Sequence, residues 1–135
     1  MLLDTDRRPV NSTVIWLLLT SMAFSDEQLR EIERHVGGLC ERRAPAHVRE
    51  QFRLRYDVSD HYVFVREARP DWHDRSQWIE CDVAKLRYVA ASNQWHLYWK
   101  RASGKWWLYE PHSRSTTLAA MVNEIDGDAY GCFFG

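Results

Sequence analysis

The amino-acid sequence predicts an α+β fold with an N-terminal helix, a five-stranded antiparallel β-meander, and a short C-terminal helix with a docked aromatic tail. Two kinds of periodicity lead to this prediction. Apolar residues recur at helical spacing in residues 25–43 and again in residues 116–127. Between them, five short runs rich in β-branched and aromatic residues are separated by turn-forming residues, a pattern typical of hairpin-linked strands.

The first helix is predicted from its start signal. Ser25 is a favourable N-cap, and Gln28 stands three residues later, as in a capping box. One helical face then carries Leu29, Ile32, Val36, Leu39 and Cys40. Gly37 and Gly38 lower the helix propensity and indicate a kink or a close contact with the sheet, and Pro45 lies just beyond the helix end.

Alternation and turn residues place the strands. Residues 52–58 alternate between apolar and charged side chains, which predicts a half-buried first strand. Residues 62–65 are apolar on both faces, so we expect the second strand to be covered on both sides. Residues 70–78 read as a loop anchored by Trp72 and Trp78, and a third strand is expected at residues 82–90.

The fourth and fifth strands, residues 95–100 and 106–109, carry most of the tryptophans. We expect the two apolar sets to share the core face, because a slip of one residue would send every side chain to the other side. This places Trp99 beside Trp106 and Leu97 beside Leu108, and it leaves Trp107 and Tyr109 on the opposite face.

After the sheet, Thr116 or Thr117 is expected to cap a short amphipathic helix that ends at Gly127. The aromatic residues of the tail should dock on the core, since they would otherwise form exposed apolar surface. These residues are Tyr130, Phe133 and Phe134.

Size, composition and charge restrict the class of protein. The chain has 135 residues, 45% hydrophobic and 27% charged, which predicts one globular domain over residues 22–135. Its net charge of −1 provides no global field for nucleic acid or an anionic membrane. Three cysteines at wide spacing disfavour a disulfide framework and suit a reducing cytoplasm.

Residues 1–21 differ from the rest of the chain. Their apolar run, residues 14–19, is far too short to span a bilayer, which needs about 20 residues. Three interpretations are open: a signal peptide, an additional helix or strand, or a non-native extension upstream of a true start at Met22. The clean helix start that follows favours the extension, which is expected to be non-native or disordered.

Four segments of the chain resemble a bacterial family, domain of unknown function 3024. They are ERRAPAHVREQFRLRYDV, EARPDW, RYVAASNQWHLYWKRASGKWWLYEP and the terminal DAYGCFFG. Two positions depart from the family pattern, which has histidine at Trp107 and Asp-Pro at Asp128-Ala129. The first departure counts against a metal or acid–base role at position 107. The resemblance implies a cytoplasmic bacterial protein and supports the later start, but it implies no activity.

Motifs for catalysis are absent from the sequence. There is no nucleophile elbow, phosphate-binding glycine loop, dinucleotide fingerprint or zinc-ligand spacing. No catalytic residue, cofactor or metal ligand is therefore assigned, and a non-enzymatic protein is the favoured expectation.

The strongest functional pattern is a basic and aromatic face of the predicted sheet. Period-2 alternation places its candidate residues as follows: Arg53, Arg55, Lys85, Arg87, His96, Tyr98, Lys100, Trp107 and Tyr109. Such a surface can stack bases and follow phosphates of single-stranded nucleic acid. The competing interpretation is an ordinary solvated face whose cationic stems cover aromatic rings.

Two functional hypotheses follow. The first is a binding module that uses this face for single-stranded nucleic acid or a protein partner, with no membrane contact. The second is a small enzyme or ligand-binding protein with a pocket under the loop at residues 70–78. A concave pocket holding a histidine and a carboxylate would favour the second hypothesis.

Overall fold

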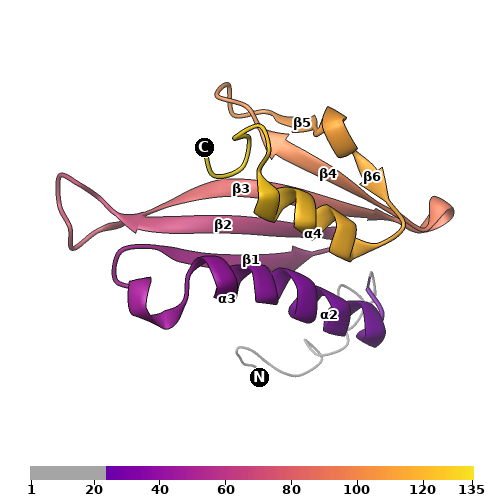
Figure 1. Cartoon of the computed structure of the whole chain (residues 1–135), viewed down its shortest axis with the longest axis horizontal. Helices are drawn as coiled ribbons and strands as arrows, with labels where there is room; N and C mark the ends of the chain where they lie inside the picture. The colour runs from indigo at the N-terminus through magenta and orange to yellow at the C-terminus, as the bar shows by residue number, and fades with distance from the viewer. Residues whose placement is uncertain (1–23) are drawn as a thin grey trace, which may run out of the picture.

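A computed structural model describes residues 24–135, so the predictions for residues 1–21 and for a start at Met22 lie outside the described part. The described chain forms two layers. One layer is an antiparallel sheet, and the other consists of helices packed on one face of that sheet (Figure 1). The predicted α+β class is confirmed.

The N-terminal helix begins at the predicted capping box. Ser25 N donates to Gln28 Oε1 at 2.9 Å, and Gln28 N donates to Ser25 Oγ at 3.1 Å. The helix runs through α2 (Asp26–Ile32), a π-helical turn η1 (Glu33–Gly37) and α3 (Gly38–Arg43). The interruption expected at Gly37 and Gly38 thus takes the form of a π turn that ends between them.

The sheet is a meander with one added strand. Its strands are β1 (Arg53–Ser59), β2 (Tyr62–Pro70), β3 (Trp78–Val89), β4 (Gln94–Lys100), β5 (Trp106–Leu108) and β6 (Arg114–Ser115). Neighbouring strands follow the order β1-β2-β3-β4-β5. Beyond β5 the chain passes through a 3₁₀ turn, η4 (Glu110–His112), and β6 then pairs with the other end of β4. Two further 3₁₀ turns, η2 (Ala46–Val48) and η3 (Ala90–Ser92), lie in the connections before β1 and β4.

The core lies between the sheet and the helices. Ile32, Val36 and Leu39 of the N-terminal helix pack with Met121 and Ile125 of α4 (Leu118–Gly127) in one buried cluster. Thr117 caps α4, as expected, through a hydrogen bond that its Oγ1 accepts from Ala120 N. The helices α2, α3 and α4 lie in front of the sheet in Figure 1, so no described helix covers the opposite face of the sheet.

That uncovered face corrects one expectation. Within residues 24–135, helices cover the second strand on one side only, and its aromatic residues Tyr62 and Phe64 stay partly exposed on the other. Apolar side chains on both faces of a strand therefore do not prove that both faces are covered. Trp72 is 78% exposed and does not anchor its loop, and Tyr130 is 70% exposed although Phe133 docks as expected.

The register between β4 and β5 corrects a second expectation. Trp99 pairs with Trp107 and Tyr98 with Leu108, one residue away from the predicted pairing. Trp106 therefore pairs with Lys100 and lies on the uncovered face. The prediction was wrong because residues 106–109 are apolar on both faces, so alternation carried no information there.

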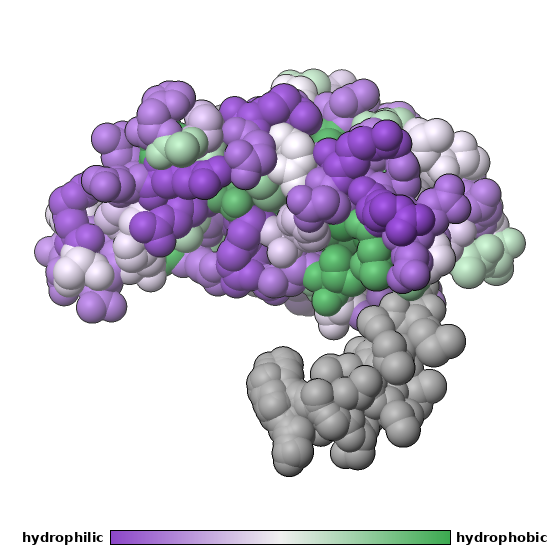
Figure 2. All heavy atoms as spheres, turned by 90° about the horizontal axis from the view of Figure 1, so that it is seen from below, coloured by the Kyte–Doolittle hydropathy of each residue, from purple (hydrophilic) through white to green (hydrophobic). Residues whose placement is uncertain are grey.

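The outer surface of the helical layer is polar. Figure 2, which views the molecule from the side where α2 and α3 lie, shows a largely hydrophilic surface with a limited hydrophobic patch. Within residues 24–135, no helix has both the length and the apolar character needed to cross a membrane.

Candidate nucleic-acid interface on the open sheet face

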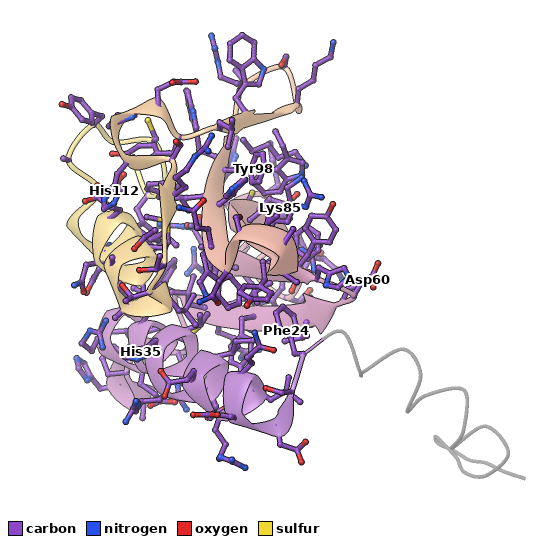
Figure 3. The ribbon with its side chains drawn as sticks, turned by 90° about the vertical axis from the view of Figure 1, so that its right-hand side faces the viewer. Phe24, His35, Asp60, Lys85, Tyr98 and His112 are labelled. Carbon is purple, nitrogen blue, oxygen red and sulfur yellow. The ribbon has the colours of Figure 1, made fainter. Side chains whose placement is uncertain are left out.

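The open face is defined here as the side of the sheet opposite α2, α3 and α4. In Figure 3, Lys85 and Tyr98 project from this side, whereas His112 lies beside α4. Strand pairing brings together on the open face most of the predicted residues: Arg53, Arg55, Lys85, Arg87, His96, Tyr98 and Lys100.

Trp107 and Tyr109, the remaining predicted residues, lie on the helical side of the sheet. Tyr109 is 1% exposed, and its ring packs against Phe133 with centroids 5.0 Å apart. Trp107 is 52% exposed near the sheet edge, and the Arg101 guanidinium lies 4.3 Å from its ring centroid. Both were assigned to the open face by the incorrect β4–β5 register.

Other residues on the open face were missed by sequence reasoning. They are Tyr62, Phe64, Arg66, Trp106 and Arg114. Alternation along β2 places Tyr62, Phe64 and Arg66 on one side of that strand. Sequence reasoning would have found them if the second strand had been treated as exposed on one side. The placement of Trp106 depended on the register of β5, and the placement of Arg114 depended on the short strand β6. The sequence carried no signal for either.

An aromatic cluster occupies the middle of the open face. It consists of Tyr62, Tyr98 and Trp106, whose rings lie around the Lys85 ammonium, and of Phe64, whose ring centroid lies 6.2 Å from that of Trp106. Lys85 Nζ lies 4.5 Å from the Tyr98 ring centroid and 5.3 Å from the centroids of Tyr62 and Trp106. Three strands and β5 supply the members, so only the folded sheet assembles the cluster.

Lys85 has no ion-pair partner among the described residues. Burial lowers the pKa of its ammonium, and the positive charge of Arg87 lowers it further. Aromatic faces are its nearest partners, and they stabilise a cation only modestly where water has access. The cluster therefore presents aromatic rings together with a cation that is available to an anionic ligand.

Next to the cluster, an ion-paired network engages several of the predicted cations. Arg55 Nε donates to Glu80 at 2.6 Å, and Lys100 Nζ donates to Asp82 at 2.6 Å. Arg66 joins the network through Asp82 at 2.9 Å and Asp57 at 2.6 Å. Arg55 and Lys100 are thus less available for phosphate than the sequence alone indicated.

Asp82 is the centre of this network. Burial raises the pKa of its carboxyl, but hydrogen bonds from Lys100 and Arg66 outweigh burial and lower the pKa below its ordinary value. The carboxylate is therefore fully ionised at neutral pH and holds both cations in place.

At the other end of the open face, three basic side chains form what we call the basic row: Arg87, His96 and Arg114. Arg87 pairs directly with His96, and His96 pairs directly with Arg114. Neither arginine has an ion-pair partner among residues 24–135. The pKa of His96 is lowered by burial and then by the charges of Arg114 and Arg87, so its imidazole is neutral at neutral pH.

The open face is also hollowed at the β1 end. A shallow depression of about 510 Å³ is lined by Arg53, Arg55, Arg66, Ala68, Trp78 and Glu80. Trp78, which was expected to anchor the loop at residues 70–78, stacks with the Arg53 guanidinium, which lies 3.7 Å from its ring centroid. The arginines at 55 and 66 in this depression are held by carboxylates.

The second hypothesis placed a pocket under the loop at residues 70–78. A hollow of about 310 Å³ does lie there, lined by Glu67, Arg69, Pro70, Asp71, Trp72, Ile79 and Cys81. It contains carboxylates and a thiol but no histidine, so it lacks the pair that would favour an enzyme.

A larger hollow of about 530 Å³ lies between α2 and the start of α4. His35 and Glu31 line it, with Nε2 and Oε1 3.2 Å apart. Both side chains are partly exposed, at 27% and 43%, so water screens their interaction. The hollow thus has the histidine and carboxylate named for the second hypothesis, but no residue of the loop at 70–78 lines it, and i, i+4 spacing on one helix accounts for the pair without a ligand.

The fold and this surface define a small α+β protein with an antiparallel sheet open on one face. The chain belongs to the family Domain of unknown function (DUF3024), whose model matches residues 24–135. The resemblance inferred from the sequence is thereby confirmed, and the match extends further toward the N-terminus than the first of the four resembling segments. No curated protein and no solved structure shows significant similarity to the chain.

Proposed function

We propose that this protein is a non-enzymatic binding module for single-stranded nucleic acid and that the open face makes the contacts. The observation that carries this proposal is the aromatic cluster around Lys85, on a sheet face that no helix of residues 24–135 covers. Sheet-borne aromatic rings stack bases without sequence preference, because every base has a π face.

Charge on the open face supports the same ligand. Its strands carry Arg53, Arg55, Arg66, Lys85, Arg87, Lys100 and Arg114 against Asp57, Glu80 and Asp82. The face is therefore positive although the chain has a net charge of −1. Because no global field assists association, we expect modest affinity with a clear dependence on salt.

The decisive experiment uses neighbouring tryptophans that lie on opposite sides of the sheet. Trp106→Ala removes a ring from the open face, and Trp107→Ala removes a ring from the helical side. Fluorescence anisotropy of labelled RNA and DNA octamers measures binding for both variants and the parent. Loss of one stacking ring costs about 1–3 kcal/mol, so Trp106→Ala should weaken binding roughly 5- to 150-fold. Trp107→Ala should bind within about twofold of the parent.

Two results would refute the proposal. One is no binding by the parent at oligomer concentrations on the order of 100 µM, the weak end of non-specific nucleic-acid affinity. The other is equal weakening by both tryptophan variants, which would place the contact elsewhere. In either case a protein partner becomes the next ligand to test on the open face.

A further inference from the structure

The basic row concentrates like charges in directly paired positions. Across an antiparallel ladder, paired residues have Cβ atoms about 4.5–5.5 Å apart, and like charges in such positions are destabilising. Arg87, His96 and Arg114 occupy three consecutive positions of this kind across β3, β4 and β6. On the β2 side the row continues to Tyr62, which is paired with Arg87 and supplies no negative charge.

His96 carries a second, independent observation. Its Nε2 atom is buried and has no hydrogen-bond partner within the described part of the chain. A buried polar atom without a partner costs free energy, and such atoms are uncommon in folded proteins. The imidazole itself is partly exposed, so rotation of the ring would present this nitrogen to a ligand with acceptor oxygens between the two arginines.

We propose that the basic row is a phosphate site and that filling it places a proton on His96. The proposal rests on the proposed function for the source of the phosphate, a nucleic-acid backbone. An anion between Arg87 and Arg114 offsets the two charges that, after burial, lower the pKa of the imidazole, and it accepts a hydrogen bond from the protonated form. Binding is therefore coupled to uptake of a proton.

The alternative place for a phosphate on this face is the depression near Arg53 and Trp78. There Arg55 is bonded to Glu80 and Asp57, and Arg66 is bonded to Asp57 and Asp82. A phosphate in the depression would have to displace these carboxylates, whereas no carboxylate of residues 24–135 is ion-paired to the arginines of the basic row. The basic row is the better anion site for this reason.

The position of the row also suits a nucleotide. Lys85 and Tyr98 stand two residues along their strands from Arg87 and His96, a separation of about 7 Å at the usual strand rise. A base stacked on Tyr98 would thus have its own phosphate within reach of the basic row. The aromatic cluster and the row together form one site of nucleotide length.

The test follows the His96 imidazole by NMR in the full chain, with sulfate as a phosphate-like probe that stays fully ionised between pH 5 and 8. The pKa of His96 is measured in sodium sulfate and in sodium chloride of equal ionic strength, and His96→Gln assigns the signal. We expect sulfate to raise the pKa of His96 by about one pH unit, the lower end for a neighbouring opposite charge. His112, which contacts Glu124 at 3.1 Å beside α4, is the internal control and should not respond to sulfate.

Arg114→Gln is the matched variant. Without sulfate it should raise the pKa of His96, because it removes a repelling charge, and it should reduce the response to sulfate at least twofold. No response of His96 in the parent, or an equal response of His112, would overturn the phosphate site. If octamers bind through Trp106 while sulfate leaves His96 unchanged, this inference fails and the proposed function stands. If sulfate acts on His96 while octamers do not bind, the phosphate site stands and the proposed function fails.

Discussion

Asp82→Asn should destabilise the fold and at the same time strengthen nucleic-acid binding. The Asp82 side chain, 20% exposed, accepts hydrogen bonds from Arg66 Nε at 2.9 Å and from Lys100 Nζ at 2.6 Å. Hydrogen bonds to charged groups contribute roughly 1.5–3 kcal/mol each, and an asparagine oxygen keeps part of one. We therefore expect a loss of about 2 kcal/mol in the free energy of unfolding.

Urea denaturation at pH 7 measures this loss, and thermal melting should show a decrease of about 8 °C for a chain of this size. The dependence on pH provides a second check. Because the folded pKa of Asp82 is lowered, its contribution is complete above the ordinary value of 3.8 and is lost as the pH falls through the folded pKa. Parent and variant should therefore converge in stability only in strong acid.

Binding should change in the opposite direction. Loss of the Asp82 carboxylate releases Arg66 and Lys100 for phosphate, so the affinity for octamers should rise and the salt slope should steepen by about 0.7 for each new contact. Glu50→Gln is the control, because Glu50 is exposed, outside the sheet and without an ion pair to any described residue. Reduced affinity in Asp82→Asn, or an equal gain in Glu50→Gln, would contradict the assignment of the open face.

Three further predictions concern the fold. Leu97→Ala, at a fully buried position, should lower the free energy of unfolding measured by urea denaturation by about 2–5 kcal/mol. Leu108→Ala, at a partly exposed position on the open face, should lower it by less than half as much. Asp128 has a φ of 45°, and its carboxylate accepts hydrogen bonds from the backbone amides of Phe133 and Phe134. Asp128→Ala should therefore lower the free energy of unfolding by about 2 kcal/mol, and Asp128→Asn by less than half of that. Equal losses in the two variants would show that the hydrogen bonds to the tail contribute nothing. Burial, with nearby Glu41 and Glu33, raises the pKa of Cys40 to about 11, so Ellman's reagent at pH 8 should label the exposed Cys81 first and Cys40 only on unfolding.

Local patterns were sufficient for the elements and for part of the candidate site. The capping box at Ser25 located the helix start, because its bonds join residues three apart and need no tertiary partner. Alternation in residues 53–58, 85–87 and 96–100 assigned charged side chains to one side of each strand. Those sides coincide on the open face, because antiparallel pairing keeps paired residues on the same side of a sheet.

The sequence by itself therefore determined the fold class, the helix starts and the polar sides of β1, β3 and β4. Only the tertiary structure decided the register of β5, the one-sided cover of β2 and the short strand β6. These three decisions moved Trp107 and Tyr109 off the open face and brought Tyr62, Phe64, Arg66, Trp106 and Arg114 onto it. The physical reason is that a strand that is apolar on both sides has no preferred face of its own, so its register depends on packing in the folded protein, where Tyr109, the residue after β5, is buried against Phe133.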